Sequence, residues 1–396
     1  MKKKIFILLA LSTLLFAQKQ ATYVGDKACA QCHTKEMHEW QGSHHDLAMK
    51  EPTDKTVVGD FKNATFELHG IKSSFYKKGD KFFIKTDGED GKLHEYEVKY
   101  TFGVYPLQQY LLKFPDGKYQ VPDIAWDSRS KEEGGQRWFH IHKDEVIKAG
   151  DVLHWTGPNL NWNYMCADCH STNLKKNYDV ETKKYDTTWD IINVSCEACH
   201  GPASEHMKWS ENQTSDLPHK GFALSFKHKS GRWDVNTTTK SAELTDREIE
   251  ICAKCHSRRS QLDDNFVPGD RFTDHYMPVT LAEGLYFADG KIQDEVYVYD
   301  SFLQSKMYEK GVTCTDCHDP HTLDRKGAGD KVCFQCHQTE KYSSTSHHFH
   351  QEGSTASSCV SCHMPARTYM GVDSRNDHSF RVPRPDISVE MEEIPN

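Results

Sequence analysis

The sequence has little hydrophobic material. Hydrophobic residues make up 37% of the 396 positions, and the mean hydropathy of −0.75 excludes a membrane protein built from many spanning helices. This supply is also thin for an ordinary core of aliphatic side chains. Aromatic residues reach 11%, however, and there are 14 cysteines, so the composition is not that of a disordered chain. We therefore expect a group other than protein to fill part of the core.

Runs of basic residues are also missing. Outside the first four residues, Lys and Arg are scattered, and the formal net charge is −9, from 49 basic and 58 acidic residues. This distribution argues against nucleic acid as a partner.

The first 17 residues have the pattern of an export signal. Lys2 to Lys4 precede an apolar run from Ile5 to Phe16, and Ala17 is a small residue suited to a cleavage site. The apolar run is too short to span a bilayer. We therefore expect a signal peptide over residues 1–17, a periplasmic mature protein, and no membrane span after cleavage.

No cysteine stands alone. All 14 fall into pairs with two residues between them, and a histidine directly follows each pair. We number the sets as motifs 1 to 7 in chain order: Cys29, Cys32 and His33; Cys166, Cys169 and His170; Cys196, Cys199 and His200; Cys252, Cys255 and His256; Cys314, Cys317 and His318; Cys333, Cys336 and His337; Cys359, Cys362 and His363.

Three chemistries use paired cysteines. Zinc ribbons do not need a histidine after each second cysteine, and one chain does not need seven redox dithiols. Covalent attachment of haem c requires the complete Cys-x-x-Cys-His set. Positions i, i+3 and i+4 share one face of a helical turn, so two thiols can bond one porphyrin while the imidazole binds its iron. We therefore expect seven covalent haem c groups, with the motif histidines as proximal iron ligands.

The spacing of the motifs divides the chain. In the long gap after motif 1, Glu95 to Phe102 alternates polar and apolar residues, which is typical of a half-buried strand. Turn signals such as Asp87-Gly88 and Asp116-Gly117 surround this stretch. The predicted fold class is a mainly α multihaem core of short helices and much coil, with an antiparallel β insertion. The predicted segments are a signal peptide at 1–17, a first haem segment at 18–50, a β-rich insertion at 51–135, and a core with six haems at 136–396.

The sixth ligand of each iron separates an electron carrier from an enzyme. A second histidine gives a low-potential carrier, whereas a vacant position lets substrate bind. Seventeen of the 24 histidines lie outside the seven motifs, which is enough for every iron. By their positions, the distal candidates are His44, His45, His206, His275, His321, His347, His348 and His378.

Not every histidine can be assigned from its position. His321 stands three residues after His318, too close to serve the same iron, so it would serve a neighbouring haem or none. His140, His142 and His154 are open between a sixth ligand and a substrate-facing role.

Two short stretches resemble a known superfamily. Cys199 to His206 reads Cys-His-Gly-Pro-x-x-x-His, and Cys317 to His321 reads Cys-His-Asp-Pro-His. Both resemble the multihaem cytochrome c superfamily of hydroxylamine oxidoreductase, pentahaem nitrite reductase, octahaem tetrathionate reductase and the tetrahaem cytochrome c of ammonia oxidisers. In that group a histidine after Gly-Pro is often the distal ligand of another haem, which implies this role for His206 and, less directly, for His321.

The chain also departs from the enzymes of this superfamily. Pentahaem nitrite reductase has a lysine in place of the proximal histidine at its catalytic haem, whereas all seven motifs here end in histidine. Hydroxylamine oxidoreductase links a tyrosine to its active haem, and none of the 17 tyrosines here stands out for that role.

Three functions are compatible with these observations. The favoured one is a periplasmic heptahaem c-type cytochrome that carries electrons through closely packed, mostly bis-histidine haems. Its partners would be redox proteins such as a membrane quinol-oxidising cytochrome or a periplasmic reductase. The alternative is a multihaem oxidoreductase with one open haem acting on nitrite, hydroxylamine or tetrathionate, with its catalytic residues unknown. The third is a haem-bearing sensor or scaffold whose β insertion binds a partner.

Overall fold

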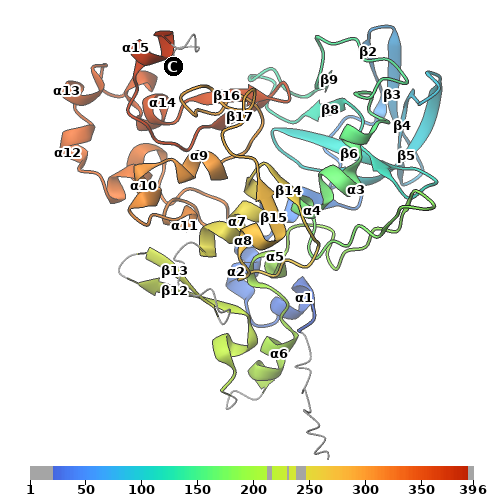
Figure 1. Ribbon diagram of the computed structural model, residues 1–396. Helices are drawn as coiled ribbons and strands as arrows, with labels where there is room; N and C mark the ends of the chain where they lie inside the picture. The colour runs from blue at the N-terminus through green and yellow to red at the C-terminus, as the bar shows by residue number, and fades with distance from the viewer. Residues whose placement is uncertain (1–20, 212–215, 230–231, 238–246, 391–396) are drawn as a thin grey trace, which may run out of the picture.

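The computed structural model describes residues 21–211, 216–229, 232–237 and 247–390. A large antiparallel sheet lies on one side of the molecule, and short helices and hairpins make up the rest (Figure 1). Helix accounts for 28% of the structure and strand for 24%, so the predicted mainly α fold class was wrong. Strands as a whole take up nearly as much chain as the helices, because no helix in the described residues exceeds ten residues.

The main sheet has nine strands in the described residues: β1 (Met49–Lys50), β2 (Lys62–Leu68), β3 (Ile71–Lys78), β4 (Lys81–Asp87), β5 (Leu93–Phe102), β6 (Leu107–Lys113), β7 (Tyr119–Gln120), β8 (Ile124–Asp127) and β9 (Arg137–His140). They pair in the order β2-β3-β4-β5-β6-β8-β9, while β1 pairs with β5 and β7 pairs with β6. Strands β2 and β9, at the ends of this path, lie close together, so the sheet is nearly closed. The strands of this sheet span Met49 to His140, which is slightly wider than the predicted β-rich insertion at 51–135. The boundaries of that insertion as a domain stay a prediction.

Alternating side chains fill the inside of this sheet. In β4, Phe82 and Ile84 are buried while Lys85 faces solvent, which is the period of two expected for a strand with one wet face. Phe75 of β3 stacks on Trp138 of β9, with ring centres 3.6 Å apart. Aromatic rings therefore supply much of the core that the sparse aliphatic residues cannot.

The helices are short: α1 (Asp26–Cys29), α2 (Thr34–Trp40), α3 (Trp162–Met165), α4 (Ala167–His170), α5 (Cys196–His200), α6 (Ser204–Glu211), α7 (Arg247–His256), α8 (Phe272–His275), α9 (Tyr299–Leu303), α10 (Lys306–Glu309), α11 (Cys314–Cys317), α12 (Thr339–Tyr342), α13 (Thr345–His348), α14 (Cys359–His363) and α15 (Pro385–Glu390). Helix α5 shows why they end early. Gly201 adopts a left-handed conformation with φ 82°, and Pro202 comes next, so the helix cannot continue past His200.

Four small hairpins lie between the helices of the described residues: β10 (Tyr178–Asp179) with β11 (Lys184–Tyr185), β12 (Leu224–Lys229) with β13 (Arg232–Thr237), β14 (Arg259–Gln261) with β15 (Tyr276–Pro278), and β16 (Ala366–Tyr369) with β17 (Asp373–Asn376). The hairpin β16–β17 packs back onto the sheet, where Val372 joins Ala125 and Phe139 in one apolar cluster.

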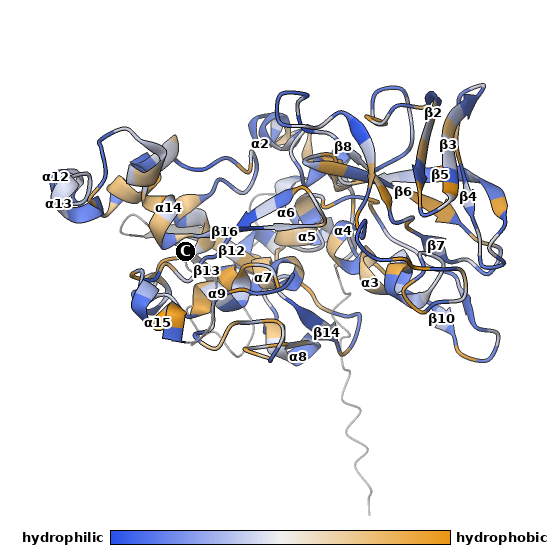
Figure 2. Cartoon of the chain, turned by 90° about the horizontal axis from the view of Figure 1, so that it is seen from above, coloured by the Kyte–Doolittle hydropathy of each residue, from blue (hydrophilic) through white to orange (hydrophobic). Residues whose placement is uncertain are grey.

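The distribution of hydropathy follows this arrangement. Figure 2 shows apolar residues within the sheet and on the inner helices α3 and α7, whereas α12 and α13 at the far edge are mostly hydrophilic. Among the residues that the structure describes, the helices lack the length and apolarity needed to cross a membrane.

Candidate haem-attachment sites

Most of the seven motifs lie on short helical turns. In motifs 3 and 7, all five residues belong to one helix, α5 and α14 respectively, and motif 4 forms the end of α7. Motif 6 begins in a 3-10 helix, Gly329–Gln335. All 14 cysteines are free thiols, so both sulfurs of each motif are available for bonds to one porphyrin.

Five motif histidines face a second histidine from elsewhere in the chain. The ring centres are separated by 6.2 Å for His33 and His206, 6.3 Å for His256 and His45, 6.4 Å for His200 and His321, 6.5 Å for His318 and His378, and 6.1 Å for His363 and His347. A metal–imidazole bond is about 2 Å long and the bonding nitrogen lies about 1 Å from the ring centre, so two imidazoles on opposite sides of one metal have centres about 6 Å apart. The five pairs therefore fit a haem iron between their rings.

Hydrogen bonding leaves the iron-binding nitrogen free in several of these rings. Nδ1 lies next to a backbone carbonyl in His206 (Lys220, 3.0 Å), His363 (Arg381, 2.8 Å) and His378 (Asn376, 2.8 Å). A carbonyl only accepts, so Nδ1 carries the proton and donates it, and Nε2 keeps the lone pair that a metal needs.

Burial lowers the pKa of His45, His170 and His200 to about 4. These imidazoles are therefore neutral at physiological pH, the form that binds iron.

The remaining predicted distal candidates have other neighbours: His44 lies beside the Tyr105 ring at 6.3 Å, His348 contacts the backbone oxygen of Ser343 at 3.2 Å, and His275 lies between Asp263 at 2.9 Å and Asp270 at 3.4 Å. Because both nitrogens of His275 meet carboxylates, this ring is held by hydrogen bonds and is not turned toward a motif.

Two motif histidines face an aromatic ring where the others face histidine. The His170 ring lies 4.5 Å from Phe102, and the His337 ring lies 5.6 Å from Tyr342. His337 is exposed, whereas His170 is partly covered. The ring neighbours of His170 and His337 thus differ from those of the five paired histidines.

Polar side chains gather near motif 2. Arg375 forms an ion pair with Glu295 at 2.7 Å and lies over the ring of Tyr297 at 5.5 Å. Burial is the main cause of the low pKa of His170, and the charge of Arg375 also lowers it, which places the guanidinium near this histidine. Burial raises the pKa of Tyr297, and the motif 2 thiols raise it further. Arg375 belongs to a C-terminal run of arginines that the sequence offers for haem propionates or for a substrate anion, but its proximity to motif 2 is not visible in the sequence because the two lie far apart along the chain.

Thiols of different motifs lie in contact, which gives the motifs a spatial order. The contacting pairs are Cys29 with Cys196, Cys169 with Cys255, Cys252 with Cys314, and Cys333 with Cys359. These pairs join motif 1 to 3, motif 2 to 4, motif 4 to 5, and motif 6 to 7. Electrostatic interactions of Cys199 with Cys252 and of Cys317 with Cys333 connect motif 3 to 4 and motif 5 to 6. The motifs therefore form one connected row, 1-3-4-5-6-7, with motif 2 as a branch at motif 4.

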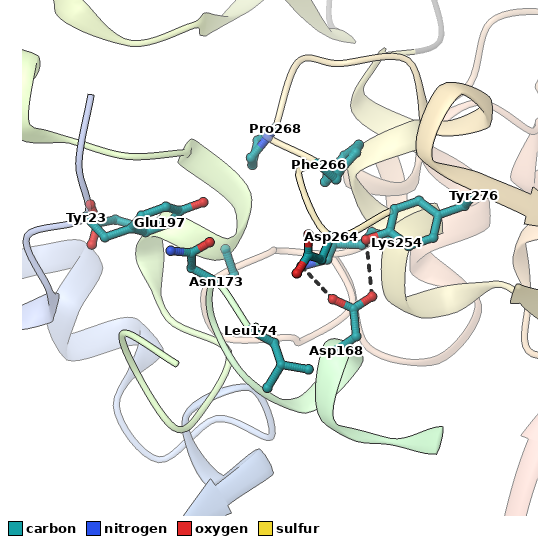
Figure 3. Close-up of a pocket in the computed structure, with 11 residues that line it drawn as sticks. Tyr23, Asp168, Asn173, Leu174, Glu197, Lys254, Asp264, Phe266, Pro268 and Tyr276 are labelled. Carbon is teal, nitrogen blue, oxygen red and sulfur yellow. Dashed lines mark hydrogen bonds and ion pairs between the residues drawn. The ribbon is translucent and has the colours of Figure 1, made fainter. Parts of the chain in front are cut away.

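A buried ionic cluster lies where motifs 2, 3 and 4 meet (Figure 3). Asp168 of motif 2 accepts hydrogen bonds from Arg259 at 2.6 Å and from the Tyr276 hydroxyl at 3.1 Å, and Lys254 of motif 4 lies 3.7 Å away. Burial raises the pKa of Asp168, but the charges of Lys254 and Arg259 outweigh it and lower the pKa, so the carboxylate stays charged. Our sequence reasoning missed this cluster. Its signal was the ionisable residue between the cysteines of motifs 2, 3 and 4, namely Asp168, Glu197 and Lys254.

Two family models match parts of the chain. The model described as cytochrome c554 and c-prime matches residues 28–70 and 125–201, and the model of a doubled CXXCH motif matches residues 306–342. The unmatched stretch between residues 70 and 125 contains strands β3 to β7 and the start of β8. A search of curated proteins finds no match. These models support the binding of haem c through CXXCH motifs.

Among solved structures, one with a TM-score above 0.5 supports the same fold, and two others are similar at lower scores. The outer cell wall cytochrome OcwA is similar over 93% of this chain and 82% of its own, with 18% identity and a TM-score of 0.58. The undecaheme cytochrome from the S-layer of Carboxydothermus ferrireducens covers 92% of this chain and 53% of its own, with 15% identity and a TM-score of 0.42. The Wolinella succinogenes octaheme sulfite reductase MccA covers 93% and 60%, with 14% identity and a TM-score of 0.39.

Proposed function

We propose that this chain, a multihaem c-type cytochrome, carries single electrons through seven connected haem c groups, six in a row and one on a branch, most of them held between two histidines. A bound haem supplies a one-electron ferric–ferrous couple, and two axial histidines keep its potential low. The observation that carries the proposal is the set of five histidine pairs with ring centres 6.1 to 6.5 Å apart. Each pair would hold one haem iron between its two imidazoles, which would leave no place for a substrate at these five irons.

The order of the motifs supports transfer over short distances. Thiols of neighbouring motifs are in contact in four places, between motifs 1 and 3, 2 and 4, 4 and 5, and 6 and 7. Porphyrins bonded to these thiols would therefore lie close together. Tunnelling falls steeply with distance, and close attachment therefore favours fast transfer. The ionic cluster around Asp168 holds motif 2 against motif 4, because Lys254 within motif 4 and Arg259 just after it both pair with the carboxylate.

The proposal places the mature protein in the periplasm, with residues 1–17 as a cleaved signal. Removal of the three lysines in that segment changes the formal charge from −9 to −12. Acidic charge accelerates association with a basic redox partner and makes the rate sensitive to salt. Suitable partners are a membrane quinol-oxidising cytochrome as donor and a periplasmic reductase as acceptor.

Two measurements test the proposal. Mass spectrometry of the denatured mature protein is expected to give the mass of a polypeptide beginning at Gln18 plus seven covalent haems. EPR and optical spectra of the ferric protein are expected to show at least five low-spin irons. A mass equal to the bare polypeptide, or a predominantly high-spin spectrum, would overturn the assignment.

The surroundings of motif 2 favour a second function. His170 faces Phe102, and Arg375, Glu295 and Tyr297 lie near the same motif. A guanidinium binds small oxyanions through paired N–H donors, and a phenol or carboxylic acid can donate a proton. This arrangement suits a multihaem oxidoreductase that acts on a nitrogen or sulfur compound at one open haem.

Ligand titration separates the two functions. For an enzyme, nitrite or cyanide is expected to change the spectrum of a single iron, and Arg375→Lys is expected to weaken nitrite binding about tenfold, because one ammonium replaces a paired donor. Arg367→Lys serves as the control. A ferric spectrum that does not respond to either ligand leaves only the electron carrier.

A further inference from the structure

The sheet contains a pocket that belongs to none of the haem-attachment sites. Residues of β2, β3, β4, β8 and β9 and of the loop after β9 line it. We call it the sheet pocket, and its main side chains are Asp87, Asp123, His140, Glu145, His154 and Trp155. Pockets inside nearly closed sheets are common sites for small ligands.

One carboxylate of the sheet pocket is fully satisfied. Nδ1 of His154 accepts the backbone N–H of Thr156 at 3.4 Å, so Nε2 carries the proton and donates it to Asp87 at 2.9 Å. The hydroxyl of Thr86 donates to the other oxygen of Asp87 at 3.1 Å. Burial raises the pKa of Asp87, but the hydrogen bond from His154 outweighs it and the pKa is lowered. Asp87 is therefore charged and needs no further donor.

The second carboxylate has no such support. Asp123 is 4% exposed, and its Oδ1 is fully covered without a hydrogen-bond partner. Leaving a buried polar group unpaired costs about 1–3 kcal/mol, and more for a charged one. The same burial raises the pKa of Asp123 to about 7. Within the described residues, the Asp123 Oδ1 atom is therefore a buried hydrogen-bond acceptor without a donor.

Two carboxylates and two histidines surround Asp123 in the sheet pocket. Burial lowers the pKa of His140 to about 4, so this ring is neutral at physiological pH. Asp87 is ionised, and Glu145 lies exposed at the rim. In the described ranges, no three His, Cys, Asp or Glu side chains are arranged to hold a metal ion. The missing donor is therefore best provided by an organic cation.

We propose that the sheet pocket binds a small primary alkylammonium ion, with its N–H groups donating to Asp123. The apolar walls fit the alkyl part, because Ile124 and Phe66 line the same pocket. The ring of Trp155 is 3% exposed and lines the pocket as well, so its face can add a cation–π contact. This site is separate from the haem-attachment sites and does not depend on the function proposed above.

Isothermal titration of the haem-loaded protein with n-propylammonium tests the proposal. The wild type is expected to bind this cation saturably, and Asp123→Asn is expected to weaken binding at least tenfold, because an amide lacks the charge and presents N–H groups of its own. Asp80→Asn, in the exposed turn between β3 and β4, is the matched control and is expected to bind like the wild type.

A neutral probe makes the test independent of any variant. 1-Propanol has nearly the shape of n-propylammonium and no charge, and it is expected to bind at least tenfold more weakly to the wild type. Equal binding of the two probes, or no saturable binding of n-propylammonium, would overturn the proposal and leave water as the hydrogen-bond donor to Asp123. Binding of Mg²⁺ or Zn²⁺ in preference to the amine would equally overturn the proposal.

Discussion

The imidazole rings of His200 and His321 lie 6.4 Å apart and within 14° of parallel. His200 closes motif 3, whereas His321 follows motif 5. One proposed iron site is therefore assembled from two motifs that are far apart along the chain. Ligand pairs of this kind hold distant segments together, and we infer that the helical part reaches its final packing only when the haems are attached.

The angles between paired rings predict the EPR spectrum of the ferric protein. They are 14° for His200 and His321, 13° for His347 and His363, and 59° for His45 and His256. Nearly parallel imidazoles split the iron d orbitals strongly and give rhombic low-spin signals, whereas crossed imidazoles give a signal with a very large highest g value. We expect both types of signal in one protein.

Single substitutions assign these signals. His321→Ala is expected to remove one rhombic component, because motif 3 loses its second imidazole. His275→Ala is the control, since His275 lies between two carboxylates and faces no motif histidine. Loss of the crossed type of signal in the His321 variant would contradict the pairing with His200.

Replacement of a distal histidine by methionine is expected to raise one potential. In His378→Met, a thioether would replace the imidazole that faces His318, and methionine ligation favours ferrous iron. Spectroelectrochemical titration should then show one component moved to higher potential, with the others in place. His348→Met is the control, because His348 contacts the backbone of Ser343. An unchanged titration of the His378 variant would count against this pair.

Some of the fold was predictable from sequence because its signals are local. Each haem-attachment motif lies within five residues, and the alternation from Glu95 to Phe102 lies within strand β5. The balance between helix and strand was not predictable in this way. Apart from α7, the α-helices of the motifs have only four or five residues, as α5 does before Gly201, while β9 joins the sheet by pairing with β8 and its Trp138 stacks on Phe75. The prediction of a mainly α chain failed because it counted the motifs and not the length of chain in each turn.

The pairing of distal histidines depends on contacts that no local pattern records. His44 and His45 are neighbours in sequence, yet His45 faces His256 while His44 is exposed beside Tyr105. The turn that contains both residues directs only the His45 ring toward the end of α7. The buried partner of Asp168 was hidden for the same reason, because Arg259 lies on a hairpin after a different motif.

Loss of the Arg259 side chain is expected to destabilise the protein strongly. Arg259 binds Asp168 at 2.6 Å and stacks 3.9 Å from the centre of the Tyr276 ring, and both charged side chains are about nine-tenths buried. Arg259→Met leaves the buried carboxylate with fewer partners, which typically costs about 3–5 kcal/mol. Thermal unfolding of the haem-loaded variant measures the effect.

Arg384→Met is the matched control for this prediction. Arg384 pairs with Asp386 at 2.7 Å, but both side chains are exposed, and such pairs contribute at most about 1 kcal/mol. Equal unfolding temperatures for the two variants would mean that the cluster between motifs 2 and 4 adds little to stability.

The pKa of Asp123 predicts a specific pH dependence of stability. Burial raises this pKa from 3.8 to about 7, so between these values the folded protein holds a proton that the unfolded chain has released. Stability from this residue is therefore present below about pH 4 and falls as the pH rises toward 7. The groups that face Asp123 in the sheet pocket are Asp87, Glu145, His140 and His154. Burial has the largest effect on the pKa of Asp123, while His154 lowers this pKa and Asp87 and Glu145 raise it by repelling the charge.

Asp123→Asn isolates this contribution, because the amide has nearly the same shape and does not titrate. The variant should match the wild type in stability near pH 4 and exceed it near pH 8, by a margin on the order of a few kcal/mol. Chemical unfolding followed by tryptophan fluorescence at several pH values gives the comparison, since Trp138 and Trp155 both lie in the sheet core. A difference between the two proteins that stays constant from pH 4 to 8 would show that Asp123 is ionised throughout this range. In that case its charge must be met by a donor such as a bound cation, and adding n-propylammonium at pH 8 should then stabilise the wild type and not the variant.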